Sequence, residues 1–163
     1  MMKCPTALFV YGTLRHDRPE HARYCRGLVR WEVARVRGQL YRLVEGYDML
    51  VVASACVPLC ASTDAREDEQ RRISLGPEAL AQAIVGAQGD WVWGELLHLA
   101  DAGEAWPTLD GWEGAVPGGV STYARLVVPV HTCSACDWAN ESFAWVYANT
   151  QPPVGARAIE VGR

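Results

Sequence analysis

The residues best suited to chemistry lie in two short segments about a hundred positions apart. The first, Tyr11-Gly12-Thr13-Leu14, follows an apolar run, and its successive backbone N–H groups could form a nest that binds an anion. The second, Leu109–Gly114, contains Glu113, a carboxylate that could accept a proton and then donate it. Taken alone, each segment has a plainer interpretation: a turn at the end of a strand, and an exposed glutamate at the end of a helix.

The elements on either side of these segments would fix their positions. The apolar run Ala7–Tyr11 predicts a buried strand that delivers the first segment at its end. A short helix is predicted over Ala102–Glu113, with Pro107 inside it and Gly114 ending it. Glu113 would then lie in the last helical turn, where the negative end of the helix dipole slightly raises its proton affinity.

The rest of the chain predicts strands with a few short helices between them. Regular alternation of strand and helix is missing, so we expect one α+β domain over residues 1–163, with a mixed β-sheet that curls on itself toward a barrel. The charged segments Arg23–Arg37 and Asp64–Arg72 are interpreted as solvated faces. Further strands are predicted at Trp31–Leu43, Tyr47–Cys56, Trp91–Leu99, Tyr123–His131 and Phe143–Asn149, helices at Pro19–Gly27 and Pro77–Ala87, a loop at Cys60–Arg72, and an irregular tail from Gln151.

Composition excludes several classes of function. The 163 residues carry a formal net charge of -4, which is not the basic footprint of a nucleic-acid-binding protein. No segment has the roughly 18 apolar residues of a membrane span, and the first apolar stretch is too short for a signal peptide. We therefore expect a cytoplasmic protein with no nucleic-acid or membrane partner. The sequence does not predict an oligomeric state.

The chain has six cysteines, and some of them could bind a metal ion. Cys133 and Cys136 have the spacing of half a zinc site, and Cys56 and Cys60 could supply the other half, in which case the chain would be a zinc-stabilised interaction protein. The second pair lacks the usual spacing, and the first falls in a turn between the last two strands. Plain thiols in a reducing compartment are the favoured interpretation, and neither a metal nor a cofactor is expected.

Five segments resemble motifs of one enzyme superfamily, in the superfamily's order. Leu8–Arg15 reads L-F-V-Y-G-T-L-R and resembles the F-V-Y-G-T-L-R signature of the gamma-glutamylcyclotransferase-like superfamily, which includes gamma-glutamylamine cyclotransferases. Two stretches depart from the pattern: residues 59–90 are longer than expected, and 115–122 form a looser link. The other matching segments are Arg37–Tyr41 (R-G-x-L-Y), Val92–Leu96 (V-x-G-E-L), Leu109–Gly114 (L-D-x-x-E-G) and Tyr123–Val130 (Y-x-R-x-x-V-x-V).

The resemblance implies a gamma-glutamylcyclotransferase-like fold and an intramolecular reaction. The α-amine of a γ-glutamyl amine, or of another small γ-glutamyl compound, attacks its own γ-carbonyl and releases 5-oxoproline and an amine. Glu113 would be the catalytic acid and base, with its pKa raised by burial against Trp112, Trp106 and Trp91. The residues expected to bind or line the substrate are Tyr11, Gly12, Thr13, Leu14, Tyr41, Tyr123 and Tyr147.

Two alternatives to this assignment remain open. One is the zinc-stabilised interaction protein described above. The other is a non-catalytic module on the same scaffold that binds a small molecule, since a fold does not guarantee a reaction.

Other polar residues are expected to be structural: Asp110 as a local cap or turn former, Arg125 as the partner of an acid, and Glu95 as a partly buried strand residue without a catalytic role. His16 and His21 follow the first loop and could line the rim of the pocket, but they are expected at the surface.

Overall fold

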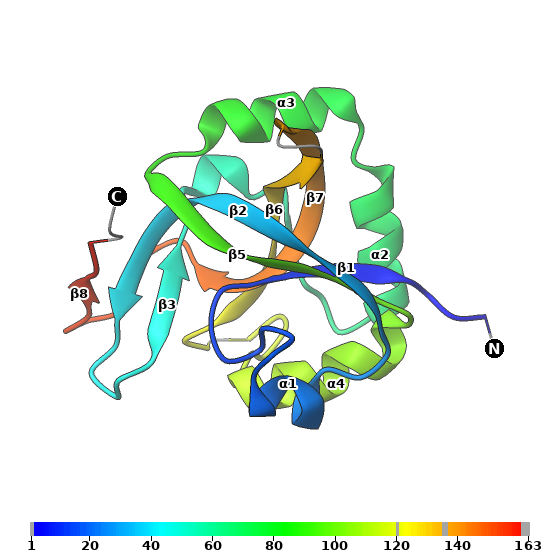
Figure 1. Ribbon diagram of the computed structural model, residues 1–163, viewed down its shortest axis with the longest axis horizontal. Coiled ribbons are helices and arrows are strands. Elements are labelled where there is room, and N and C mark those ends of the chain that lie inside the picture. The colour runs from blue at the N-terminus through cyan, green and yellow to red at the C-terminus, as the bar shows by residue number, and fades with distance from the viewer. Residues whose placement is uncertain (1, 120, 135–136, 161–163) are drawn as a thin grey trace.

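The computed structural model describes residues 2–119, 121–134 and 137–160 and shows one curled sheet with helices around it (Figure 1). The eight-stranded sheet is mixed, with both parallel and antiparallel pairs. Its strands are β1 (Thr6–Val10), β2 (Leu28–Arg42), β3 (Asp48–Val51), β4 (Leu59–Cys60), β5 (Asp90–Leu99), β6 (Ala124–Ser134), β7 (Asp137–Asn149) and β8 (Arg157–Ala158).

The sheet closes because its first strand pairs on both sides. β1 lies antiparallel to β5 and parallel to β7, while β2 bonds to β5 along most of its length and also reaches β6. β6 and β7 form a long hairpin that completes the ring. The predicted α+β class with a curled sheet is therefore confirmed. Side chains that point into the ring form one apolar core, which includes Phe9, Val36, Leu50, Val128 and Val146.

The helices lie at the ends and along one side of this barrel. Figure 1 shows α3 across one end and α1 and α4 at the other, with α2 along the side. A second apolar cluster, centred on Trp106, Leu109 and Trp145, joins α4 to the sheet. The bounds are α1 (Pro19–Tyr24), a 3-10 turn (Ser54–Cys56), α2 (Ala65–Ser74), α3 (Pro77–Gly86) and α4 (Ala102–Glu113).

Local signals fix both ends of α4. The Asp101 carboxylate caps the first turn by accepting a hydrogen bond from the amide of Gly103 at 3.2 Å. Gly114 adopts a left-handed conformation with φ of 66°, which other residues rarely tolerate, and ends the helix directly after Glu113. These bounds are the ones that the sequence predicts, so the catalytic candidate lies at a well-defined helix terminus.

Gly94 allows β5 to approach the end of β1 closely. A Cβ atom at this position would lie 2.1 Å from the carbonyl oxygen of Val10 and 2.9 Å from the ring of Phe9. Any side chain here would force the two strands apart. The close approach brings the next residue, Glu95, opposite Val10, where β1 ends and the first candidate segment begins.

Three predictions about elements were wrong. Cys60–Arg72 is not a loop, because α2 begins at Ala65, and it is not simply a solvated face, because Asp68 and Glu69 are fully buried. The predicted strand Tyr47–Cys56 ends at Val51 and is followed by the 3-10 turn. The tail is not wholly irregular, since β8 pairs with the end of β2.

The cysteines that the structure describes are all free thiols, namely Cys4, Cys25, Cys56, Cys60 and Cys133. Cys136, the other half of the Cys-x-x-Cys motif, lies outside the described residues. Within the described ranges, no helix combines the length and the apolar character that crossing a bilayer requires.

Candidate active site

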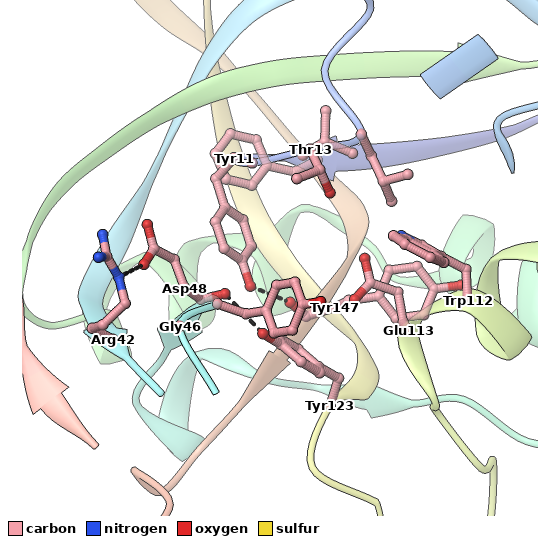
Figure 2. A pocket seen from close by; sticks show the side chains of 14 residues that line it. Tyr11, Thr13, Arg42, Gly46, Asp48, Trp112, Glu113, Tyr123 and Tyr147 are labelled. Carbon is pink, nitrogen blue, oxygen red and sulfur yellow. Dashed lines mark hydrogen bonds and ion pairs between the residues drawn. The ribbon is translucent and has the colours of Figure 1, made fainter. Parts of the chain in front are cut away.

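The two candidate segments meet at one cavity of about 500 Å³, shown in Figure 2. The loop after β1 forms one wall, and the end of α4 forms another. The turn between β2 and β3 contributes a third, and Tyr123, directly before β6, and Tyr147 of β7 complete the lining. The lining residues are Phe9, Val10, Tyr11, Gly12, Thr13, Leu14, Arg42, Gly46, Tyr47, Asp48, Trp112, Glu113, Tyr123 and Tyr147.

All but one of the residues expected at the site line this cavity. The loop Tyr11–Leu14, Glu113, Tyr123 and Tyr147 are brought together from four separate parts of the chain. Tyr41 is the exception, because it is not part of the lining. Successive side chains of a strand point to opposite faces, and Arg42, the next residue of β2, occupies the lining instead.

Glu113 is held in an environment that favours its protonated form. Burial raises the pKa of its carboxyl from 4.5 to about 7. None of the described residues donates a hydrogen bond or forms an ion pair with this carboxylate. A carboxyl group with a pKa near neutrality exchanges a proton readily in either direction, as general acid–base catalysis requires.

Only one of the three tryptophans expected around Glu113 lines the cavity. Trp112 does so, stacked on Tyr24 of α1 at 4.2 Å between ring centroids. Trp106 is fully buried in the core against Trp145. Trp91 packs beneath the guanidinium of Arg35, away from the cavity lining.

A buried polar network fixes the last turn of α4. Asp110 accepts hydrogen bonds from Arg125 Nε at 3.0 Å and from the Tyr147 hydroxyl at 2.6 Å. Arg125 is 3 % exposed, and its other side lies 3.5 Å from Asp68 of α2. The expectation that Arg125 pairs with an acid is confirmed. Asp110 is structural, but not as the local cap or turn former that was expected, because its side chain pairs with Arg125 and Tyr147. Because Glu113 lies three residues after Asp110, this network sets where its carboxylate sits.

Two tyrosine hydroxyls of the cavity, those of Tyr11 and Tyr123, form hydrogen bonds with the backbone. Tyr11 donates to the carbonyl of Tyr147 at 2.7 Å and accepts from the amide of Leu50 at 3.0 Å, while Tyr123 donates to the carbonyl of Asp48 at 2.8 Å. Burial raises the pKa of both phenols above the ordinary value of 10, and the charge of Glu113 contributes. The hydroxyls therefore stay protonated at neutral pH and tie the walls of the cavity together.

The loop after β1 is folded so that some of its amides remain free. The amide and the side-chain Nε of Arg15 both donate to the carbonyl of Gly12, at 3.3 and 3.2 Å. The trans peptide plane then turns the N–H of Thr13 to the opposite side. Among the residues that the structure describes, no acceptor is hydrogen-bonded to the amides of Thr13 or Leu14. These donors are available to an anion at the cavity wall.

Sequence reasoning missed the wall made by the β2–β3 turn. Arg42, Gly46, Tyr47 and Asp48 line the cavity, and Arg42 Nε forms an ion pair with Asp48. Nothing in the local sequence indicates that closure of the barrel places the turn at Glu45-Gly46 against this cavity.

The described residues contain no cluster of three or more histidine, cysteine or acidic side chains suited to a metal ion. This finding does not address the zinc alternative, because Cys136 is outside those residues. The cavity itself is lined by aromatic rings, a glycine-containing loop and the Glu113 carboxylate.

One family model matches the first part of the chain. Residues 8–59 match the sequence model of the family described as gamma-glutamyl cyclotransferase, AIG2-like. No curated protein matches the chain in sequence. The match includes the loop Tyr11–Leu14 but stops before Glu113, so the position of Glu113 rests on the structure.

The fold resembles that of a larger protein of known structure. The crystal structure of YkqA from Bacillus subtilis matches with a TM-score of 0.50 and 18 % sequence identity, over 95 % of this chain and 38 % of that chain. This chain therefore spans less than half of YkqA, and at this identity the likeness concerns the fold alone. The motifs and the matched segment show that part of this chain resembles the gamma-glutamyl cyclotransferase, AIG2-like family.

Proposed function

We propose that this protein is an enzyme that cleaves a γ-glutamyl amine or another small γ-glutamyl compound and releases 5-oxoproline and an amine. The observation that carries the proposal is that one cavity holds Glu113, with its pKa raised to about 7, together with the free amides of Thr13 and Leu14. No cofactor is required, because the substrate's own α-amine is the nucleophile.

The first step removes a proton from the substrate. The α-ammonium of the γ-glutamyl group transfers a proton to the Glu113 carboxylate, and the free amine attacks the γ-carbonyl carbon. A C–N bond forms, and the carbonyl oxygen becomes an oxyanion. Tethering makes this attack unimolecular, and a cavity that holds the chain bent lowers the barrier further.

The second step returns the proton. The attacking nitrogen still carries one surplus proton in the tetrahedral intermediate. As the intermediate collapses, protonated Glu113 donates the first proton to the leaving nitrogen, the bond to that nitrogen breaks, and the regenerated carboxylate removes the second proton from the ring nitrogen. Glu113 then passes this second proton to the departing amine or to water, so the carboxylate is restored and the cycle is balanced in protons. We assign the amides of Thr13 and Leu14 to the negative charge of the substrate, either its α-carboxylate or the developing oxyanion. Tyr11, Tyr123 and Tyr147 shape the cavity around it, and Tyr41 has no assigned role.

The pH dependence of kcat/KM provides a first test. In the free enzyme Glu113 must be ionised to act as a base, so kcat/KM should fall as the pH drops through about 7, tenfold for each pH unit below it. The measurement is release of 5-oxoproline from γ-L-glutamyl-ethylamide and from γ-glutamyl dipeptides between pH 5 and 9. An acid limb centred near 4.5, the ordinary value for a glutamate, would contradict the role given to Glu113.

The same assay separates this proposal from a binding module. Calorimetric binding of γ-glutamyl compounds without any release of 5-oxoproline would favour a non-catalytic protein on this scaffold. Release of 5-oxoproline and amine in equal amounts supports the enzyme.

A further inference from the structure

A second acidic residue, Glu95, contacts the loop that carries the free amides of Thr13 and Leu14. Glu95 lies on β5 opposite Val10 and is only 8 % exposed. One carboxylate oxygen accepts a hydrogen bond from the backbone N–H of His16 at 2.7 Å. The other oxygen lies 2.5 Å from Nδ1 of the His16 ring. Both oxygens of this nearly buried carboxylate therefore contact the same loop residue, His16.

The flat face of the His16 ring makes a further contact. It stacks on the indole of Trp31 at 3.8 Å between centroids, with 12° between the planes. Trp31 lies on β2 and Glu95 on β5, two strands that are hydrogen-bonded neighbours. His16 is thus contacted by two adjacent strands of the barrel. It lies partly at the surface, as expected, with its side chain 33 % exposed, but its ring is paired and stacked.

The loop is also attached to the fold at Leu14. The Leu14 side chain is buried in the apolar cluster around Trp106, and the ring of buried His21 of α1 contacts the carbonyl of Leu14 at 2.9 Å. The pair of Glu95 with His16, two residues after Leu14, restrains the other end of this loop. His21 was expected at the surface, so its burial contradicts that expectation.

We propose that Glu95, acting through His16 and Trp31, is a positioning residue that holds the amides of Thr13 and Leu14 in place for the substrate. Glu95 and His16 are outside the cavity lining, so neither is a catalytic residue. An anion site made of backbone amides depends on the loop being held before the ligand arrives, because ordering the loop during binding would weaken affinity. The kinetic part of the test rests on the proposed function.

The test compares Glu95→Ala with variants that keep or mimic the contact. Glu95→Ala should raise KM for γ-L-glutamyl-ethylamide about tenfold, with a smaller effect on kcat, because loosening the loop weakens ground-state binding and transition-state binding alike. Glu95→Gln should stay within about threefold of wild type. Its amide oxygen can still accept from the His16 N–H, and its NH₂ group can donate to the other tautomer of the ring.

Hydrogen–deuterium exchange gives a readout that does not depend on turnover. In Glu95→Ala, the amides of Arg15 and His16, which are hydrogen-bonded in the wild type, should exchange about ten times faster, and Glu95→Gln should restore most of the protection. The matched control is Glu32→Ala. Glu32 forms a similar pair with the His98 ring at 2.7 Å, but neither residue lines the cavity or contacts the loop. Its removal should change neither KM nor the exchange of the loop.

An unchanged KM in folded Glu95→Ala would overturn the proposal, whether or not the loop loosens. His16→Ala provides the same test if Glu95→Ala does not fold, because the change lies in the loop and leaves the sheet intact. It should raise KM about threefold, and an unchanged KM would again count against the proposal. Absence of 5-oxoproline with the wild-type protein would instead count against the proposed reaction, and the exchange rates alone would then decide the role of Glu95.

Discussion

Glu113→Gln is expected to lower kcat for the release of 5-oxoproline by about a thousandfold, in the middle of the range for loss of a general acid–base group. Glutamine keeps the size and hydrogen-bonding shape of the side chain but can neither accept the proton of the α-ammonium nor return it to the leaving nitrogen. KM should change little, because the free amides of the loop and the tyrosine-lined walls are untouched. Steady-state kinetics with γ-L-glutamyl-ethylamide measure both quantities.

The matched control is Glu104→Gln on the same helix. Glu104 lies in the first turn of α4 and is exposed, so this variant should keep wild-type turnover. The two variants also differ in stability. Because the folded protein holds Glu113 at a raised pKa, its ionisation costs stability as the pH rises from 4.5 toward 7, and the cost is complete above 7. Glu113→Gln should therefore be at least as stable as wild type at pH 8. Full activity in Glu113→Gln would show that another group transfers the proton.

The largest effect on stability is expected from a substitution at Glu69, which is not part of the cavity lining. Glu69 of α2 is fully buried and accepts hydrogen bonds from the Thr6 hydroxyl at 2.8 Å and from the Trp145 indole at 3.0 Å. It also forms an ion pair with Arg72. Glu69→Ala would leave three donors without their acceptor, one of them charged. Loss of one member of a buried ion pair costs about 3–5 kcal/mol in the free energy of unfolding.

The neighbouring pair Glu67–Arg71 supplies the control on the same helix. Both side chains are about half exposed, and their ion pair has the i,i+4 spacing. Glu67→Ala should cost less than about 1 kcal/mol, as solvent-exposed pairs generally do. Urea unfolding followed by tryptophan fluorescence measures both variants. Equal losses for Glu67→Ala and Glu69→Ala would mean that the buried contacts of Glu69 do not hold α2 to β1 and β7.

The same helix shows where prediction from sequence fails. α2 carries no apolar stripe, and its buried positions are the acids Asp68 and Glu69 rather than leucine or valine. A pattern based on hydrophobicity therefore assigned it to a solvated loop. One signal was available: Asp64 followed three residues later by Glu67 is typical of a capped helix start, and the Asp64 carboxylate does accept from the amides of Arg66 and Glu67.

By contrast, local signals sufficed for α4 and β1. A capping aspartate before Ala102 and a glycine after Glu113 define the helix without reference to the rest of the fold. The apolar run of β1 is buried on both faces, as its composition predicts. These two elements position Glu113 and the loop Tyr11–Leu14, so the core of the candidate site could be predicted from the sequence.

The remainder of the site depends on contacts between distant parts of the chain. The β2–β3 turn becomes a wall of the cavity only because β2 curves across the barrel, and a one-residue difference on that strand replaces the predicted Tyr41 with Arg42. Likewise, Glu95 is an ordinary strand residue in the sequence. Its contact with His16 arises from the pairing of β5 with β1, which no local pattern shows.

The most direct measurement is a crystal structure of the protein with 5-oxoproline bound. The account predicts the product in the cavity, with its carboxylate or its ring carbonyl on the amides of Thr13 and Leu14 and its ring N–H facing the Glu113 carboxylate. A product bound elsewhere, or one in the cavity with Glu113 turned away from the ring, would contradict it.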